Sequence, residues 1–329
     1  LGYSFCSPKC CTSLLNWGSI FNQGEDFSLL DPWINSLEDI LKQGRSFPSL
    51  EIELRVTAAM FAAMVWRRLG HPDIKIWKEQ AVSLLLRCED KNICIQLLTF
   101  LSIYHLYIGD FATAKKFVND LRHLSESKDT AQLLTLWAKA TEALYECFTA
   151  SFDSCLKTVA EGIRIANERG MHIWDTHLLE HGAAAALSAG DLITANSMLK
   201  KLKPFSEKLR RIDSAYYQYL KAWEAFSRKD IHGYPDYIEL CRIYEALGFS
   251  FGEILLHQTL ALLSHERGDE KRASEHIAKL IKLAGEIDSR YAEFIAYMLA
   301  AQISFDRGED NKGLAALKNG MAIGKAQGF

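Results

Sequence analysis

Small and apolar residues recur along this chain in a register that repeats about every 40 residues. A Gly-Asp pair marks the register most clearly at residues 109, 190 and 268, and weaker copies begin at 24, 70, 150, 229 and 308. From residue 70 onward the successive steps are 39, 41, 40, 39, 39 and 40 residues, whereas the first step, from 24 to 70, is 46 residues. A fixed period of this length is typical of repeat proteins, in which each unit is one supersecondary element.

The residues around each Gly-Asp pair predict two helices that cross closely. A small residue lies seven positions before the pair, at Ala63, Ser102, Ala143, Ala183, Ala222, Ala261 and Ala301. Five positions after it lie Ala114, Cys155, Ala195, Ala273 and Gly313, and nine positions after it lie Val118, Val159, Leu199, Ile238, Ile277 and Leu317. We expect the glycine to end the first helix with a positive φ, the aspartate to cap the second helix, and the residue at plus nine to face the core.

These patterns predict an all-α fold, a right-handed superhelical solenoid of about eight antiparallel helix pairs. The Gly-Asp turn followed by a small residue resembles the tetratricopeptide repeat, although the period of about 40 residues exceeds the usual length. HEAT repeats have the right length but lack the Gly-Asp signature, so they are the second choice. We expect one repeat domain over residues 1–329, with an irregular repeat over 1–48, regular repeats over 49–329, and a bend where Gly233, Tyr234 and Pro235 interrupt the unit that starts at Lys229.

Composition limits the possible partners. The chain has 38 Lys and Arg residues against 41 Asp and Glu residues, a formal charge of −3, so we expect no direct contact with nucleic acid. No run of 18 apolar residues occurs, which argues against a membrane span. The chain begins at Leu1 rather than Met, and Lys9 is the only charge before Phe21. We interpret the chain as part of a longer cytoplasmic protein.

No sequence motif assembles a complete catalytic or metal site. His177, Glu180 and His181 match the HxxEH pattern of inverted zinc peptidases, but they fall inside a predicted repeat helix, so an ordinary repeat role is favoured. The segment from Gly320 to Lys325 is too short for a phosphate loop, and Cys6, Cys10 and Cys11 lack a second ligand pair for zinc. We therefore expect a protein that is not an enzyme, with no metal and no cofactor. The basic stretch from Lys200 to Arg211 is interpreted as a solvated helix end.

The first helix of each unit is expected to line the inner groove, as in tetratricopeptide arrays. Its inward positions lie 13, 10, 6, 3 and 2 residues before the turn. The candidate binding residues at these positions are Trp137, His177, Glu180, Tyr216, Tyr219, Trp223 and Gln258, with His265, and toward the N-terminus Met60, Met64, Arg67, Arg68 and Tyr107. Aromatic rings beside a few polar groups suit a sugar, a nucleotide or a peptide. The alternative is that these rings merely pack between helices.

Several short blocks together resemble one known family. They are 31–41 (DPWINSLEDIL), 47–55 (FPSLEIELR), 58–61 (AAMF), 70–73 (GHPD), 187–192 (LSAGDL) and 326–329 (AQGF). In this order they resemble the helical region of MalT-like, ATP-dependent bacterial transcriptional activators, particularly those with a bacterial transcriptional activator domain.

That resemblance implies a sensor region that receives a small-molecule inducer or a regulatory protein or peptide. It further implies an NTPase domain, which would bind ATP, and a DNA-binding domain elsewhere in the full-length protein. The family shares no ligand motif, so it transfers no binding residue to this chain. The main hypothesis is thus a ligand-sensing domain of a transcriptional activator, and the alternative is a stand-alone scaffold that binds peptides in its groove.

Overall fold

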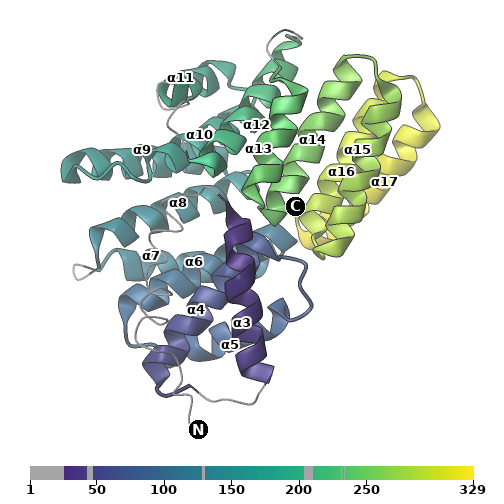
Figure 1. Ribbon diagram of the computed structural model, residues 1–329. Coiled ribbons are helices and arrows are strands. Elements are labelled where there is room, and N and C mark those ends of the chain that lie inside the picture. Colours follow the sequence, from purple (N-terminus) through teal and green to yellow (C-terminus); the bar gives the residue numbers. More distant parts are fainter. Residues whose placement is uncertain (1–25, 43–46, 128–129, 204–209, 231, 233) are drawn as a thin grey trace.

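The computed structural model describes residues 26–42, 47–127, 130–203, 210–230, 232 and 234–329, and the regular structure in these ranges is entirely helical. It comprises fifteen α-helices and one 3₁₀ helix (Figure 1). Their bounds are η1 (Phe27–Leu30), α3 (Asp31–Lys42), α4 (Leu50–Arg67), α5 (Ile74–Leu85), α6 (Lys91–Ile108), α7 (Phe111–Ser125), α8 (Gln132–Phe148), α9 (Phe152–Arg169), α10 (Asp175–Ser188), α11 (Leu192–Leu202), α12 (Arg211–Arg228), α13 (Tyr237–Leu247), α14 (Ser250–Glu266), α15 (Glu270–Glu286), α16 (Arg290–Asp306) and α17 (Asp310–Gln327). The predicted all-α class is confirmed.

The helices form successive pairs, from α4 with α5 to α16 with α17, as the register predicts. The turn residues have the expected left-handed backbone, with φ of 88° at Gly109, 75° at Gly190, 74° at Gly268 and 71° at Gly308. Asp110 and Asp191 cap the next helix by accepting hydrogen bonds from the backbone N–H groups of Thr113 and Thr194, each at 3.0 Å. Local sequence at the turns therefore explains where one helix of each pair ends and the next begins.

The small residues allow the two helices of a pair to approach each other. All seven small residues that lie seven positions before a turn are buried, as are Ala114, Cys155, Ala195 and Ala273 after the turns. The expectation for the residue at plus nine holds for Val118, Val159 and Leu199, which are buried. It is wrong for Ile238, which is 75% exposed. Because α13 begins only at Tyr237, after the degenerate turn, the register shifts and Leu240 enters the core instead.

The superhelix turns far enough for its two ends to touch. α14 contacts α4, and α16 contacts α6, so the first helices of the units surround a common centre (Figure 1). Several hydrogen bonds between described residues cross this junction, including one from Lys75 Nζ to Asp288 Oδ2 at 3.1 Å. Arg67 Nη1 donates to the carbonyl oxygen of Gly248 at 3.1 Å, Ser250 Oγ donates to the carbonyl oxygen of Arg67 at 2.5 Å, and Ser289 Oγ donates to the carbonyl oxygen of Tyr107.

Two turn glycines make this junction possible. A Cβ atom on Gly70 would lie 2.6 Å from the carbonyl oxygen of Glu286, and one on Gly109 would lie 2.7 Å from the backbone nitrogen of Tyr291. These glycines allow the backbones of the first units to approach those of the last units more closely than any other residue would. Gly70 is thus required for close contact rather than for a positive φ.

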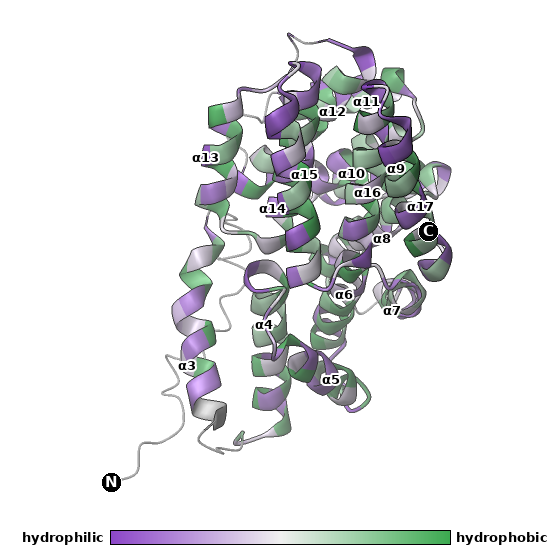
Figure 2. Ribbon diagram, turned by 90° about the vertical axis from the view of Figure 1, so that its right-hand side faces the viewer, coloured by the Kyte–Doolittle hydropathy of each residue, from purple (hydrophilic) through white to green (hydrophobic). Residues whose placement is uncertain are grey.

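The inner helices are apolar on more than one side because they pack against several neighbours at once. Figure 2 shows α4 and α6 green over most of their length, whereas purple, hydrophilic residues are frequent on α9 and α15. In α6 the buried residues run almost without interruption from Ile93 to Tyr107. Among the described residues, no helix combines the length and the apolar character that a membrane crossing requires.

Candidate functional site

The first helices surround a cavity of about 230 Å³. Its walls come from α4, α6, α8, α10, α12, α13, α14 and α16. Among the residues proposed for the inner face, seven from α8, α10, α12 and α14 line it, namely Trp137, His177, Glu180, Tyr216, Tyr219, Trp223 and Gln258. The periodic register thus brings together residues that are up to 121 positions apart in sequence. Their role in binding stays a prediction.

Some residues predicted from the sequence lie outside the cavity, and some residues that line the cavity were not predicted. Met60 and Met64 are buried in the core, Arg67 and Arg68 form ion pairs with Asp31, and His265 pairs with Asp306. Tyr107 lines the cavity as expected. The cavity is also lined by Trp174, Phe251 and Tyr291, which lie 16 or 17 residues before their turns and were not predicted from the sequence. Extending the inward positions by one helical turn toward the N-terminus would have found them. Cys6, Cys10 and Cys11 lie outside the described residues.

Aromatic rings cover one wall of the cavity from α8 to α12. Trp137 and Trp174 are stacked, with ring centres 5.6 Å apart and planes inclined by 6°. Tyr216 and Tyr219 are also stacked at 5.7 Å, and Trp223 follows at 5.9 Å from Tyr219. Across the junction, the ring of Tyr107 stacks on that of Phe251 at 4.0 Å. Such a surface can hold apolar or planar groups and can also attract a cation to the ring faces.

A polar cluster lies at one side of this aromatic wall. His177 Nδ1 lies 3.0 Å from Asp213 Oδ1 and 3.6 Å from Glu180 Oε2. Arg210 donates to Asp213 Oδ2 through Nε at 2.9 Å, and its Nη2 lies 3.2 Å from His177 Nδ1. Burial raises the pKa of Asp213, but His177 and Arg210 outweigh this effect and lower the pKa to about 2. Asp213 is therefore charged and already paired.

This cluster has the spacing of a metal site but not its charge. One ligand atom each from His177, Glu180 and Asp213 lies within 4.8 Å of the others. The guanidinium of Arg210, however, contacts both His177 and Asp213, so a cationic group already neutralises the carboxylate that a metal would need. Arg210 was assigned to a solvated helix end in the sequence analysis. That expectation is wrong, because its side chain is largely buried against these two residues.

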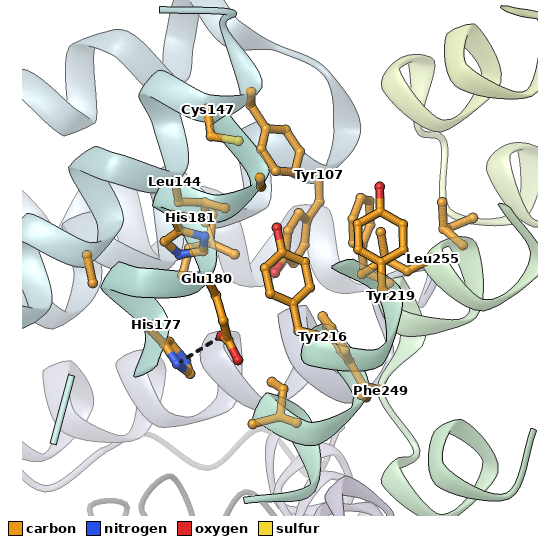
Figure 3. Close-up of a pocket in the computed structure, with 18 of the residues that line it drawn as sticks. Tyr107, Leu144, Cys147, His177, Glu180, His181, Tyr216, Tyr219, Phe249 and Leu255 are labelled. Atoms are coloured by element: carbon orange, nitrogen blue, oxygen red, sulfur yellow. Dashed lines mark ion pairs between the residues drawn. The ribbon is translucent and has the colours of Figure 1, made fainter. Parts of the chain in front are cut away.

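Two buried side chains in the cavity each have one polar atom without a hydrogen-bond partner among the described residues. The atoms are Oε1 of Glu180 and Nδ1 of His181. Burial, followed by the neighbouring Asp213, raises the pKa of Glu180 well above its usual value. Burial and the nearby His177 lower the pKa of His181 to about 3, so this imidazole is neutral at pH 7. Figure 3 shows the carboxyl group of Glu180 between the rings of His177 and Tyr216.

A second cavity of about 480 Å³ adjoins the first. The two share Tyr219, Trp223, Gln258 and Ile295 as lining residues. The second cavity extends along α12, α14 and α16 toward α17, where Gln302 and Asp306 add polar groups. A ligand longer than one side chain can therefore occupy both spaces, with Tyr219, Trp223 and Gln258 at the boundary.

The helix pairs and the ring-lined inner cavity define the class: a tetratricopeptide-like helical repeat protein with a pocket on its inner face. No protein-family profile and no curated protein matches the chain. Among solved structures, the chain is similar to a Rap protein complexed with competence and sporulation factor. The TM-score is 0.65 at 13% identity, and the match covers 98% of this chain and 99% of that one.

The chain is also similar to NprR in complex with its cognate peptide NprX, with a TM-score of 0.51 at 16% identity. This match covers 84% of the chain and 78% of NprR. At these identities the likeness shows the fold alone. The resemblance to MalT-like activators stays a prediction from the sequence.

Proposed function

We propose that this chain is a regulatory scaffold that binds a short peptide in its inner cavity. The observation that carries this proposal is the pair of adjoining cavities, enclosed by the first helices and lined by aromatic rings with few polar groups. The similarity to NprR, which was solved with its cognate peptide, supports the same use of the fold. The proposed role is binding rather than catalysis.

The arrangement of two adjoining cavities suits an extended ligand such as a peptide. Pockets for drug-sized ligands usually have volumes of about 300–1,000 Å³. The first cavity, at about 230 Å³, accommodates one or two side chains, and the larger second cavity continues from it. An extended peptide can place successive side chains in the two spaces, because neighbouring residues in an extended chain are about 3.3 Å apart.

Affinity selection tests the proposal. The protein is incubated with a random library of pentapeptides, and the peptides that elute with it in size-exclusion chromatography are identified by mass spectrometry. We expect a defined set of peptides to be retained, and Trp223→Ala to lower their affinity by about tenfold or more, since truncation of a buried aromatic anchor typically costs about 2 kcal/mol and about 1.4 kcal/mol corresponds to tenfold. Ile193→Ala, at an 86% exposed position on α11, is the matched control and should leave binding unchanged.

Two outcomes would contradict the proposal that the cavity binds a peptide. Retention of no peptide by the wild type, or equal affinity in the wild type and Trp223→Ala, would show that the cavity does not bind peptides in this way.

The finer assignment, to the sensor region of a MalT-like activator with its own NTPase and DNA-binding domains, is supported by the six sequence blocks and remains part of the proposal. In that setting peptide binding would regulate the other domains of a longer protein. The test is to express the full-length protein and measure its ATPase rate with and without a peptide selected on this chain. An unchanged ATPase rate would favour the stand-alone scaffold.

A further inference from the structure

Glu180 has an unusual place in the first cavity. Of the described residues that line the cavity, it is the one with a carboxyl group, and none is a lysine or an arginine. The residue is only 2% exposed, and its Oε1 has no hydrogen-bond partner in the described part of the chain. A buried carboxyl oxygen without a partner costs free energy, so its presence calls for an explanation such as a missing ligand.

The neighbouring groups do not provide that partner. His177 lies 3.6 Å from Oε2 but is closer to Asp213, at 3.0 Å. Asp213, in turn, holds the guanidinium of Arg210. His181 on the same helix is neutral at pH 7, and Tyr216 of α12 presents its ring to the imidazole of His181 at 6.0 Å. Two buried phenols also face Glu180, those of Tyr216 on α12 and Tyr244 on α13, and their pKa values are raised by burial, so both are neutral. The guanidinium of Arg210 lies near enough to act on the carboxyl group, where it opposes the rise in the pKa of Glu180 that burial and Asp213 cause.

We propose that Glu180 receives a protonated amine or a guanidinium group of the bound ligand. This inference rests on the proposed function, because it takes the ligand to be a peptide. The cation of the peptide is then either its amino terminus or a lysine or arginine side chain. The cation would form a charge-assisted hydrogen bond with Glu180 Oε1 while its apolar portion contacts the aromatic wall.

Two physical arguments favour a cation over a neutral or acidic group. Once ionised, the carboxylate of Glu180 attracts a cation strongly, because among the described residues no lysine, arginine or other carboxyl group lines this cavity and the apolar lining limits access of water. The rings of Tyr216, Trp137 and Trp174 present faces that also attract cations. An acidic group would instead be repelled by the charge of the nearby Asp213 and would further disfavour ionisation of Glu180.

The raised pKa of Glu180 adds a proton-linked consequence. Burial and Asp213 shift Glu180 toward its protonated form in the empty cavity, whereas a bound ammonium group favours the carboxylate, so binding is coupled to release of a proton. The affinity for the amine should therefore increase as pH rises. The pKa of His181 is lowered to about 3, so this imidazole stays neutral near pH 7. Other titratable or charged groups also face the site, namely His177, Asp213, Arg210, Tyr216 and Tyr244. The comparison with Glu180→Gln therefore isolates the contribution of the carboxyl group.

Three small probes of similar shape test the site directly. Phenethylamine, 2-phenylethanol and phenylacetate are titrated against the protein, and binding is followed by the fluorescence of the cavity tryptophans. We expect the wild type to bind phenethylamine about tenfold or more tightly than 2-phenylethanol, which corresponds to a hydrogen bond to a charged group. Phenylacetate should bind most weakly.

Two matched variants give the proposal its control. Glu180→Gln keeps the shape of the protonated carboxyl group and should reduce the preference for phenethylamine to within about twofold, with a flat dependence on pH. Glu146→Gln changes another buried glutamate that has one unpartnered oxygen, but Glu146 does not line the cavity and bonds to Ser154 Oγ at 2.6 Å. This variant should keep the preference. Equal binding of amine and alcohol by the wild type, binding of neither, or an unchanged preference in Glu180→Gln would overturn the proposal.

The peptide library shows whether the cation is an amino terminus or a side chain. It also distinguishes a failure of the cation site at Glu180 from a failure of peptide binding. Peptides with free amino termini and no basic side chain identify the amino terminus, and acetylated peptides that contain lysine or arginine identify a side chain. Peptides retained without any cationic preference would refute the role of Glu180 and leave peptide binding intact. If no peptide is retained but the amine preference depends on Glu180, peptide binding fails while the cation site is supported.

Discussion

Replacing Ser289 by alanine should weaken the junction between the two ends of the superhelix. Ser289 is buried, and its Oγ donates to the carbonyl oxygen of Tyr107 while it accepts from the backbone N–H of Ala292 at 3.0 Å. It therefore caps α16 and also provides a donor to one of the last carbonyl groups of α6, which have no partner within their own helix. One hydroxyl group links the second unit of the solenoid to the seventh.

The expected cost follows from these two roles. Loss of a serine cap destabilises a protein by about 1 kcal/mol. Leaving a buried carbonyl oxygen without its donor costs about 1–2 kcal/mol more. Ser289→Ala should thus lower the free energy of unfolding by about 2–3 kcal/mol.

Urea denaturation followed by far-ultraviolet circular dichroism measures this change, and Ser49→Ala provides the control. Ser49 also caps a helix, accepting from the backbone N–H of Ile52 at 3.3 Å, but it is exposed and lies away from the junction. Its loss should cost about 1 kcal/mol or less. If Ser289→Ala costs no more than Ser49→Ala, the contact between the ends of the superhelix does not stabilise the fold, and the reasoning is refuted.

Two further predictions concern the polar cluster and the junction. Burial opposes the charge of Asp213, but His177 and Arg210 lower its pKa to about 2, which is below the value of about 3.9 in the unfolded chain. The charged form therefore stabilises the fold by about 2–3 kcal/mol. This contribution should be present above pH 4 and disappear as pH falls toward 2. Asp213→Asn should therefore unfold more easily at pH 7 and show a flatter stability profile between pH 4 and 2, and identical profiles would contradict the pKa assignment. Gly109→Ala should destabilise by at least 1–2 kcal/mol in thermal unfolding, because φ is 88° and the new Cβ would lie 2.7 Å from the backbone nitrogen of Tyr291. Gly190→Ala shares the positive φ but meets no atom within 4 Å, so an equal loss in both variants would show that the junction tolerates the methyl group.

The sequence alone predicted the helix pairs and part of the inner face, although it did not separate core residues such as Met60 and Met64 from those that line the cavity. Both depend on local signals that are repeated in every unit: a glycine that accepts a left-handed backbone, an aspartate that caps the next helix, and a small residue where two helices cross. Because adjacent units stack in the same way, residues at equal distances before their turns fall in neighbouring rows. Trp137, His177 and Tyr216 could therefore be placed together from their positions 13 residues before successive turns.

Only the tertiary structure decided how far the superhelix turns. A small rotation at each pair accumulates over the seven described pairs, and no single unit encodes the sum. This sum brings α14 and α16 against α4 and α6, which converts an open groove into a cavity and stacks Tyr107 on Phe251. The same arrangement pairs Arg210 with Asp213 and leaves Glu180 buried without a partner, because the contacts of a charged group depend on which distant side chains the fold places around it.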